Sequence, residues 1–280
     1  MSHEQPEISV IDRTKALFGR HRALVGMIHV GALPGTPRHE RSLESLLAAA
    51  AADAELLLDS GFDALIVENM HDLPYLRRRV GPEIVASMSL LVRAIRETVD
   101  LPVGVQILAG ANREALAVAH AAGAGFIRAE GFAYASVADE GLMEEADAGP
   151  LLRYRRMIGA EDVAIIADVH KKHSAHAITG DVTLEEQVST AEFMGADGVV
   201  ITGAATGSPT DPGHLARASG RGNLPVIVGS GADFDSIGSL LRDADAVIVG
   251  SSVKTDGCWS NPVDAGRAKR LVEAARRDHP

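Results

Sequence analysis

Short apolar runs recur along the chain, and each is followed by a longer segment in which apolar residues repeat with the period of an α-helix. A run of this kind, bounded by glycine, proline or charged residues, is typical of a strand that is buried on both faces. We therefore predict eight strands: Ala23–His29, Ala64–Glu68, Val103–Ile107, Gly125–Ala129, Val163–Asp168, Gly198–Thr202, Val226–Gly229 and Ala246–Gly250.

The segments between the predicted strands carry signals for helix ends. Ser, Thr, Asn and Asp are common where a helix begins, and glycine is common just after one ends. Thr183 followed by Glu186 forms a capping box, and a cap residue before proline marks two further starts. The expected caps are Ser42, Asn112, Thr183, Asp211 and Asn261, and the expected stops are Gly61, Gly123 and Gly195.

Eight strand-and-helix units in about 250 residues match a (β/α)8 TIM barrel. A doubly wound parallel sheet is the competing arrangement, but eight units without a break favour closure. We therefore predict an α/β chain with an N-terminal extension over residues 1–20 and a barrel domain over residues 21–280. The extension is expected to form a short helix across the barrel floor.

Composition narrows the class of protein. The chain of 280 residues carries 27 Lys and Arg against 38 acidic residues, a formal charge of −11, and no basic stripe, so we expect no nucleic-acid partner. No apolar run has the length of a membrane span, so no integral membrane segment is predicted. Cys258 is the single cysteine, which rules out an intrachain disulfide and favours the reducing cytoplasm. We also expect a homo-oligomer.

Polar residues gather at the ends of the predicted strands. Asp168 and His170 alternate along the chain with the apolar Ile166, so the three share one face, and the first two lie at the carboxyl end. In TIM barrels this end carries the active site. The candidate catalytic residues are His29, Glu68, Glu130, Asp168, His170 and Lys171, and the candidate ligand-binding residues are Asn69, Gln106, Arg128 and Thr202.

Each of these assignments has a structural alternative. The carboxylates of the mouth are candidate bases, but they can equally form a charge network with Arg128. His29 can be a buried histidine bonded to a backbone carbonyl. Lys171 suits electrostatic binding of an anionic ligand better than Schiff-base chemistry, which requires a desolvated lysine.

The last two predicted strands end in the small residues Gly229-Ser230-Gly231 and Gly250-Ser251-Ser252. Glycine lets backbone N–H groups approach an anion closely, and helix N-termini favour negative charge. In many TIM barrels the loops at these two positions hold a phosphate. The pattern predicts a phosphorylated small-molecule ligand, although small residues also ease a tight turn between strand and helix.

No cofactor is predicted. A divalent metal is kept as an alternative, because His29, Glu68, Asp168 and His170 all have ligand side chains at the mouth. The sequence has no H-x-H or H-E-x-x-H spacing to support it.

Several longer segments resemble one known family. They are VGMIHVGALPGTP (Val25–Pro37), IVENMHD (Ile66–Asp72), LLRYRRMIGAEDVAIIADVHKKHSAH (Leu151–His176), TGSPTD (Thr206–Asp211), PVIVGSGAD (Pro225–Asp233) and VIVGSSVKTDG with NPVD (Val247–Asp264). In wording, order and spacing they are similar to the BtpA/SgcQ family over nearly all of the chain after residue 22. The resemblance implies a TIM barrel of the ribulose-phosphate-binding type. It implies no single reaction, because the family is named after a photosystem I biogenesis factor that associates peripherally with membranes, while other relatives occur beside sugar-metabolism genes.

Two segments depart from the commoner pattern of that family. After the third strand the chain reads QILAGANREAL (Gln106–Leu116), where many relatives carry an NVLRND-like stretch. After the fourth it reads RAEGFAYASVADEG (Arg128–Gly141), where many carry RVNVLTG. We therefore expect the ligand-facing side of these two strands, Glu130 included, to be particular to a subgroup.

The leading functional hypothesis is an enzyme that acts on a phosphorylated sugar or nucleotide-like compound. Asp168 or Glu68 would exchange a proton, with His170 or Lys171 stabilising developing charge. Isomerisation, lyase or aldol-type cleavage, and glycosidic-bond cleavage all fit this arrangement. The alternatives are a non-catalytic BtpA-type biogenesis or stability factor for a membrane complex such as photosystem I, and a metal-dependent hydrolase.

Overall fold

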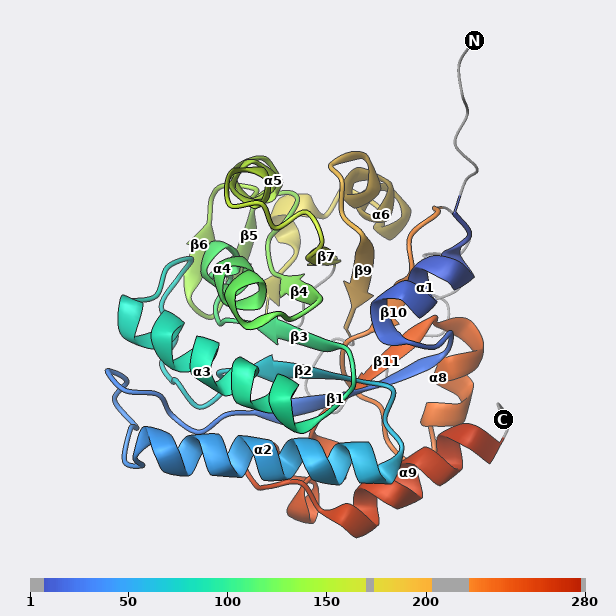
Figure 1. Ribbon diagram of the computed structural model, residues 1–280. Helices are drawn as coiled ribbons and strands as arrows, with labels where there is room; N and C mark the ends of the chain where they lie inside the picture. The colour runs from blue at the N-terminus through green and yellow to red at the C-terminus, as the bar shows by residue number, and fades with distance from the viewer. Residues whose placement is uncertain (1–7, 170–173, 203–221, 278–280) are drawn as a thin grey trace.

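The computed structural model describes residues 8–169, 174–202 and 222–277. Within them eight parallel strands close into a barrel (Figure 1), because β1 pairs with β2 on one side and with β11 on the other. The strands are β1 (Ala23–His29), β2 (Ala64–Glu68), β3 (Val103–Gln106), β4 (Phe126–Ala129), β7 (Ala164–Asp168), β9 (Gly198–Ile201), β10 (Val226–Val228) and β11 (Ala246–Val249). The TIM barrel is confirmed, and each predicted strand agrees with the observed one to within one residue at either end.

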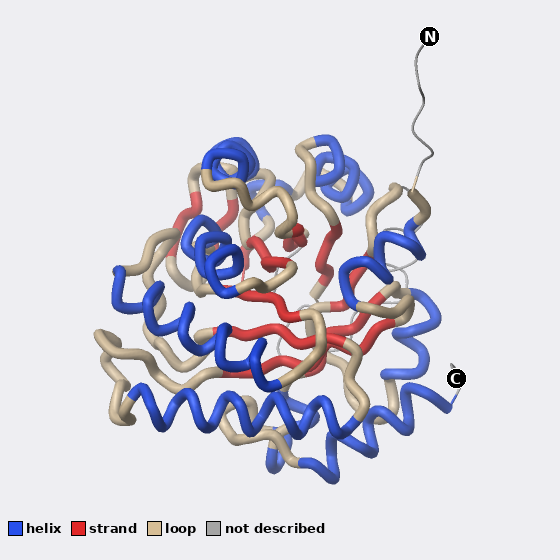
Figure 2. The backbone as a smooth tube through the Cα atoms, viewed as in Figure 1, coloured by secondary structure: helices blue, strands red, loops and turns tan. Residues whose placement is uncertain are grey.

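Helices surround the strands, as Figure 2 shows by its blue outer layer around red strands. Among the described residues the α-helices are α1 (Val10–Phe18), α2 (Leu43–Ser60), α3 (Pro82–Thr98), α4 (Asn112–Ala122), α5 (Ala148–Met157), α6 (Leu184–Phe193), α8 (Ile237–Asp243) and α9 (Ala265–Arg277). None of these helices combines the length and the apolar character that a membrane crossing requires.

Most of the expected helix ends are present. The Ser42 hydroxyl accepts from the Ser45 N–H, Gly61 ends α2 with a φ of 92°, and Thr183 with Glu186 forms the capping box of α6. Gly123 likewise follows α4 with a φ of 77°, and Gly195 lies two residues beyond α6.

Two predicted caps are wrong, and a third, Asp211, lies outside the described residues. Asn112 is the first residue of α4 rather than its cap, because its side chain binds the backbone of Glu130 instead. Asn261 donates to the Thr255 carbonyl, and α9 begins later, where the Asp264 carboxylate accepts from the Arg267 N–H at 2.8 Å.

The barrel interior is filled by aliphatic side chains that alternate along the strands, such as Val25 and Met27 on β1 and Ile66 on β2. Phe126 enters this core through space left by Gly104, where a Cβ would lie only 2.0 Å from its ring. Phe18, the last residue of α1, packs edge-to-face against Phe126 at 5.3 Å, so α1 closes the floor. The opening opposite this floor lies at the carboxyl ends of the strands. Because side chains alternate along a strand, the last inward-facing residue of each strand points into that opening.

Aspartates secure the amino end of the barrel. Asp63, Asp197 and Asp245 each precede a strand and accept a hydrogen bond from a backbone N–H at the start of the neighbouring strand, at 2.7–2.8 Å. Asp63 also pairs with Arg276 of α9, which ties the last helix to the first two strands. These contacts support stability rather than chemistry, because they lie at the end opposite the mouth.

A small antiparallel sheet that the sequence did not predict lies beside the barrel. It consists of β5 (Ser136–Ala138), β6 (Gly141–Met143) and β8 (Ser174–Ala175), in the order β6-β5-β8. The first two form a hairpin in the loop after β4, and the third comes from the loop after β7. The sheet therefore joins two loops of the mouth.

Replacing Asp63 by alanine should destabilise the barrel. The change leaves the Leu24 N–H without its acceptor and Arg276 without its carboxylate, so the free energy of unfolding should fall by about 1–3 kcal/mol. Urea unfolding followed by circular dichroism measures this change. Asp100→Ala, at an exposed position in the loop after α3, is the matched control and should change stability by less than about 0.5 kcal/mol. Equal effects of the two substitutions would contradict the assigned role.

Candidate active site at the barrel mouth

Polar side chains are buried together at the carboxyl ends of the strands. Glu68, Gln106, Arg128, Asp168 and Thr202 extend the inward-facing rows of β2, β3, β4, β7 and β9, and each is at most 8% exposed. Buried charges are costly unless they are paired and hydrogen-bonded. The contacts among these residues therefore decide which side chains are fixed and which can engage a ligand.

Arg128 and Asp168 form a two-pronged ion pair across adjacent strands β4 and β7. The Arg128 Nε lies 3.1 and 3.2 Å from the two Asp168 carboxylate oxygens, and its Nη2 donates to Oδ1 at 3.0 Å. Burial acts to lower the pKa of Arg128, but the neighbouring carboxylates, Asp168 first, more than offset it and raise that pKa. The guanidinium therefore stays charged and holds the Asp168 side chain in a fixed orientation.

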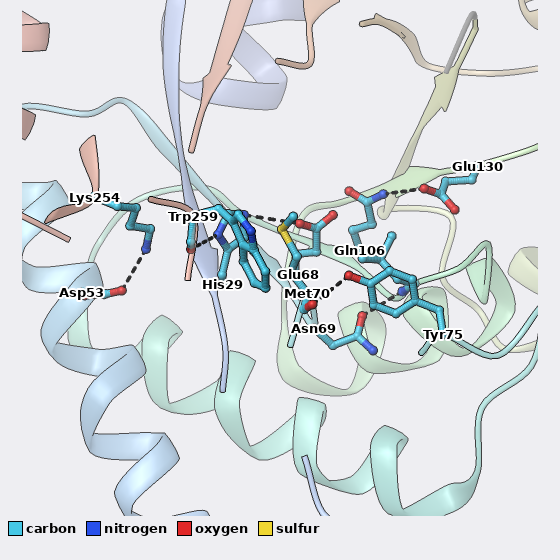
Figure 3. Close-up of polar contacts among 11 residues, drawn as sticks. His29, Asp53, Glu68, Asn69, Met70, Tyr75, Gln106, Glu130, Lys254 and Trp259 are labelled. Atoms are coloured by element: carbon cyan, nitrogen blue, oxygen red, sulfur yellow. Dashed lines mark hydrogen bonds and ion pairs between the residues drawn. The ribbon is translucent and has the colours of Figure 1, made fainter. Parts of the chain in front are cut away.

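His29 and Glu68 form a second pair on β1 and β2 (Figure 3). The His29 Nδ1 lies 2.9 Å from the Trp259 backbone carbonyl, and its Nε2 lies 3.4 Å from Glu68 Oε2. A carbonyl only accepts, so Nδ1 carries a proton and Nε2 is the nitrogen presented to the carboxylate. The pair can share or pass one further proton, which is what general acid–base chemistry requires.

Glu130 lies just beyond β4 and is positioned by polar neighbours on two elements. Gln106 Nε2 donates to its carboxylate at 3.2 Å (Figure 3), while Asn112 donates to its carbonyl at 2.8 Å and accepts from its N–H at 3.1 Å. Gln106 is 2% exposed, and its side-chain oxygen has no hydrogen-bond partner among the described residues. A buried acceptor without a hydrogen-bond partner favours a ligand that supplies a donor group.

Asn69 organises the loops of the mouth. Its side-chain oxygen accepts from the Leu108 N–H at 2.8 Å, and its amide donates to Asp72 at 2.8 Å. Asp72 in turn accepts from the Leu33 N–H at 2.8 Å, so the pair links the loops after β1, β2 and β3. Burial raises the pKa of Asp72 despite these hydrogen bonds. These contacts give Asn69 a structural role, and its expected contact with ligand stays a prediction.

The loop after β10 has the close packing expected of a phosphate loop. A Cβ on Gly229 would lie 2.4 Å from Val200 and 2.8 Å from Thr202, so only glycine fits there. The same Cβ would lie 3.2 Å from Arg128 Nη2, which places a buried cation directly beneath the loop. The Ser230 hydroxyl is buried and has no hydrogen-bond partner among the described residues.

The loop after β11 has a similar arrangement. A short 3-10 helix, η2 (Ser251–Val253), begins immediately after Gly250, and the Ser252 hydroxyl is buried without a hydrogen-bond partner in the described part of the chain. A Cβ built on Gly250 would lie 3.5 Å from the His29 ring. The loop therefore brings a potential anion site next to the His29–Glu68 pair.

Lys254 and Trp259 support this side of the mouth. Lys254 is 1% exposed, and its Nζ donates to Asp53 of α2 at 3.1 Å (Figure 3). Burial lowers its pKa, with Asp53 acting in the opposite direction. The Trp259 ring packs against His71 at 4.8 Å, and its carbonyl orients His29. Sequence reasoning missed Lys254, because no local pattern distinguishes it from an ordinary loop lysine and its partner lies on a distant helix.

Two of the predicted catalytic residues, His170 and Lys171, lie outside the described residues. The described ranges contain no group of three or more His, Cys, Asp or Glu side chains that could hold a metal ion. Asp168, one of the four proposed metal ligands, is instead bound by Arg128. His170, another of the four, lies outside the described residues, so the metal-dependent alternative stays a prediction.

A closed eight-stranded parallel barrel with buried polar side chains at its carboxyl end defines a TIM-barrel protein with a pre-formed polar mouth. A comparison of the sequence with known protein families also gives a clear result. The chain belongs to the BtpA family, which matches residues 20–277.

Relatives match the chain over nearly its whole length. An uncharacterized protein of Caenorhabditis elegans, named as mitochondrial, is 44% identical over 92% of this chain and 94% of its own. The photosystem I biogenesis protein BtpA of Synechocystis is 38% identical over 92% of this chain and 89% of its own. Among solved structures, (S)-3-O-geranylgeranylglyceryl phosphate synthase from Thermoplasma acidophilum superposes with a TM-score of 0.61, covering 96% of this chain and 99% of that one at 16% identity. This last likeness concerns the fold alone.

Removing Arg128 should destabilise the protein through Asp168. In Arg128→Met the buried carboxylate loses its two-pronged partner, and the free energy of unfolding should fall by about 3–5 kcal/mol. The double variant Arg128→Met with Asp168→Leu should lose clearly less than the sum of the two single changes, because no charge is left unpaired. Urea unfolding of the four proteins gives the coupling energy. Simple additivity would show that the two side chains do not depend on each other.

Proposed function

We propose that the protein is an enzyme that acts on a phosphorylated small molecule, a sugar phosphate or a nucleotide-like compound. The observation that carries the proposal is the pair of glycine–serine loops after β10 and β11, in which the buried Ser230 and Ser252 hydroxyls have no hydrogen-bond partner among the described residues. A phosphate brings several acceptor oxygens and would satisfy both hydroxyls. Arg128 beneath Gly229 adds positive charge on the same side.

The position of these loops suits chemistry at the His29–Glu68 pair. A ligand whose phosphate lies between Ser230 and Ser252 would extend across the mouth from Gly250, which lies beside His29. Glu68 would then take a proton from a carbon or hydroxyl group, or return one, with His29 Nε2 as the neighbouring acceptor or donor. Arg128 would stabilise negative charge that develops on the reacting atoms.

Several features support an enzyme over a scaffold. The Thermoplasma synthase that shares the fold was solved with its substrate sn-glycerol-1-phosphate, an example of a phosphorylated ligand on this architecture. Buried acid–base pairs and oriented carboxylates at a barrel mouth are costly to keep without a chemical role. Isomerisation, lyase or aldol-type cleavage and glycosidic-bond cleavage each require the proton transfer described above, and all three remain within the proposal.

The name of the Synechocystis relative supports a second candidate, a biogenesis or stability factor for a membrane complex. The formal charge of −11 disfavours adsorption to anionic lipid, so such a role would depend on contact with a protein partner. A cytoplasmic location and a homo-oligomeric state also remain predictions, which cell fractionation and analytical ultracentrifugation would test.

Phosphate binding is the first test of the proposal. Inorganic phosphate and a panel of sugar phosphates and nucleotides should raise the thermal midpoint of the wild type, because a ligand that binds only the folded state stabilises it. The double variant Ser230→Ala with Ser252→Ala should lose most of that rise. Ser239→Ala on the exposed face of α8 is the matched control and should retain it. The absence of any rise with every phosphorylated compound would reject the proposal and favour the biogenesis role.

The proton-transfer role assigned to Glu68 is tested separately. Glu68→Gln should lower the turnover number by about 10²–10⁴-fold for the compound that gives the largest thermal rise, while its binding changes little. Proton NMR in D2O follows both product formation and exchange of carbon-bound hydrogen. Glu97→Gln on the surface of α3 serves as control. Full turnover in Glu68→Gln would remove Glu68 from the mechanism.

A further inference from the structure

A pocket opens beside the mouth, between the loops that follow β4 and β7. Its inner wall contains Glu130 and Asp168, so it is continuous with the candidate active site. Its outer wall comes from the small antiparallel sheet and the residues around it. Among the described residues, the rest of the lining comprises Gly131, Ala133, Tyr134, Ala135, Ser136 and Met143 after β4, with Val169, Ser174, His176, Thr179 and Gln187 after β7.

The inner end of the pocket presents a carboxylate whose position is fixed. Asn112 binds both the N–H and the carbonyl of Glu130, and Gln106 donates to its side chain. Arg78, from the loop after β2, donates to the carbonyls of Glu130 and Gly131 at 3.2 and 3.1 Å. Three neighbouring elements thus hold this residue in place, which is the kind of support that a ligand-orienting group requires.

The outer wall is equally constrained. Backbone pairing of β5 with β8 joins Ala138 to Ser174 across the two loops. The Tyr134 hydroxyl lies 2.7 Å from the Thr190 hydroxyl of α6, and the Tyr134 backbone has a φ of 61°. A left-handed conformation at a bulky residue is unfavourable, and such strain concentrates at ligand-binding sites. The outer wall is therefore held in place by backbone pairing and by the contact of Tyr134 with α6.

The chemistry of the lining defines what fits. Glu130 offers a carboxylate, which the Gln106 amide positions by donating to it at 3.2 Å. The Ser174 hydroxyl, on the opposite wall, is buried and has no hydrogen-bond partner among the described residues. Tyr134 and the buried Met143 supply an apolar surface between them. This combination suits a carbon skeleton that carries hydroxyl or amine hydrogen-bond donors.

We infer that this pocket is a specificity subsite for the part of the ligand that bears no phosphate, and that it selects a group with hydroxyl or N–H donors. The inference rests on the proposed function, in which the phosphate lies at the loops after β10 and β11 on the far side of the mouth. Glu130 and Ser174, which both line the pocket, are assigned as the residues that recognise the donors.

A substitution that fills the pocket tests the inference. Ala135→Phe places a ring into the space, whereas Val137→Phe adds the same ring to the exposed face of the same hairpin and is the matched control. Binding of inorganic phosphate, D-ribose 5-phosphate and AMP is measured by calorimetry. The wild type should bind at least one of the two larger compounds at least about tenfold more tightly than inorganic phosphate. Ala135→Phe should abolish that preference while its affinity for inorganic phosphate stays within about twofold of the wild type.

Retained binding of inorganic phosphate shows that the variant is folded, and Ser174→Ala gives a milder second test. It should weaken binding of the preferred compound by about three- to tenfold through the loss of one hydrogen bond. A preference for D-ribose 5-phosphate indicates recognition of sugar hydroxyls, and a preference for AMP indicates recognition of the base.

Three outcomes overturn the inference. Equal affinity of the wild type for inorganic phosphate and for both larger compounds overturns the subsite but leaves the phosphate site intact. A preference that survives in Ala135→Phe overturns the location of the subsite. No binding of any phosphorylated compound overturns the proposed function and the subsite together.

Discussion

The ion pair between Arg128 and Asp168 is the contact on which the mouth of this barrel depends. Five polar side chains are buried where five strands end, and a cluster of this kind is stable only if its charges compensate each other. Arg128 supplies the positive charge among Asp168, Glu68 and Glu130. Because it binds Asp168 through both Nε and Nη2, it also joins the side chains at the ends of β4 and β7, where their loops diverge. The small sheet and the pocket beside it are built on those two loops.

Around this pair the mouth divides into two halves with different chemistry. Around Arg128, the ends of β2 and β3 and the residue after β4 present acceptors, the carboxylates of Glu68 and Glu130 and the side-chain oxygen of Gln106. The side formed by β10 and β11 presents donors, the hydroxyls of Ser230 and Ser252 with glycine backbone next to them. A ligand with an anionic end and a hydroxyl-bearing or amine-bearing end would match both halves at once. This separation of donors and acceptors connects the proposed phosphate site with the proposed subsite.

The fold followed from the sequence because its signal is periodic and repeated. Buried parallel strands such as Ala64–Glu68 appear as continuous apolar runs, and the alternation along Ile66 and Glu68 is enough to place the polar residue inside the mouth. The partners of these residues could not be derived in the same way. Asn112 has the sequence context of a helix cap, and only the spatial proximity of β4 shows that its side chain holds Glu130. The small sheet was missed because strands of two or three residues leave no periodic pattern.

The packing of α1 against the barrel interior determines the route by which a ligand can enter and leave. Phe18 and Phe126 fill the floor, and aliphatic side chains fill the space above them, so the barrel is no channel. Whatever binds at the mouth must enter and leave by the same opening. For the enzyme proposed above, substrate and product would share this single route.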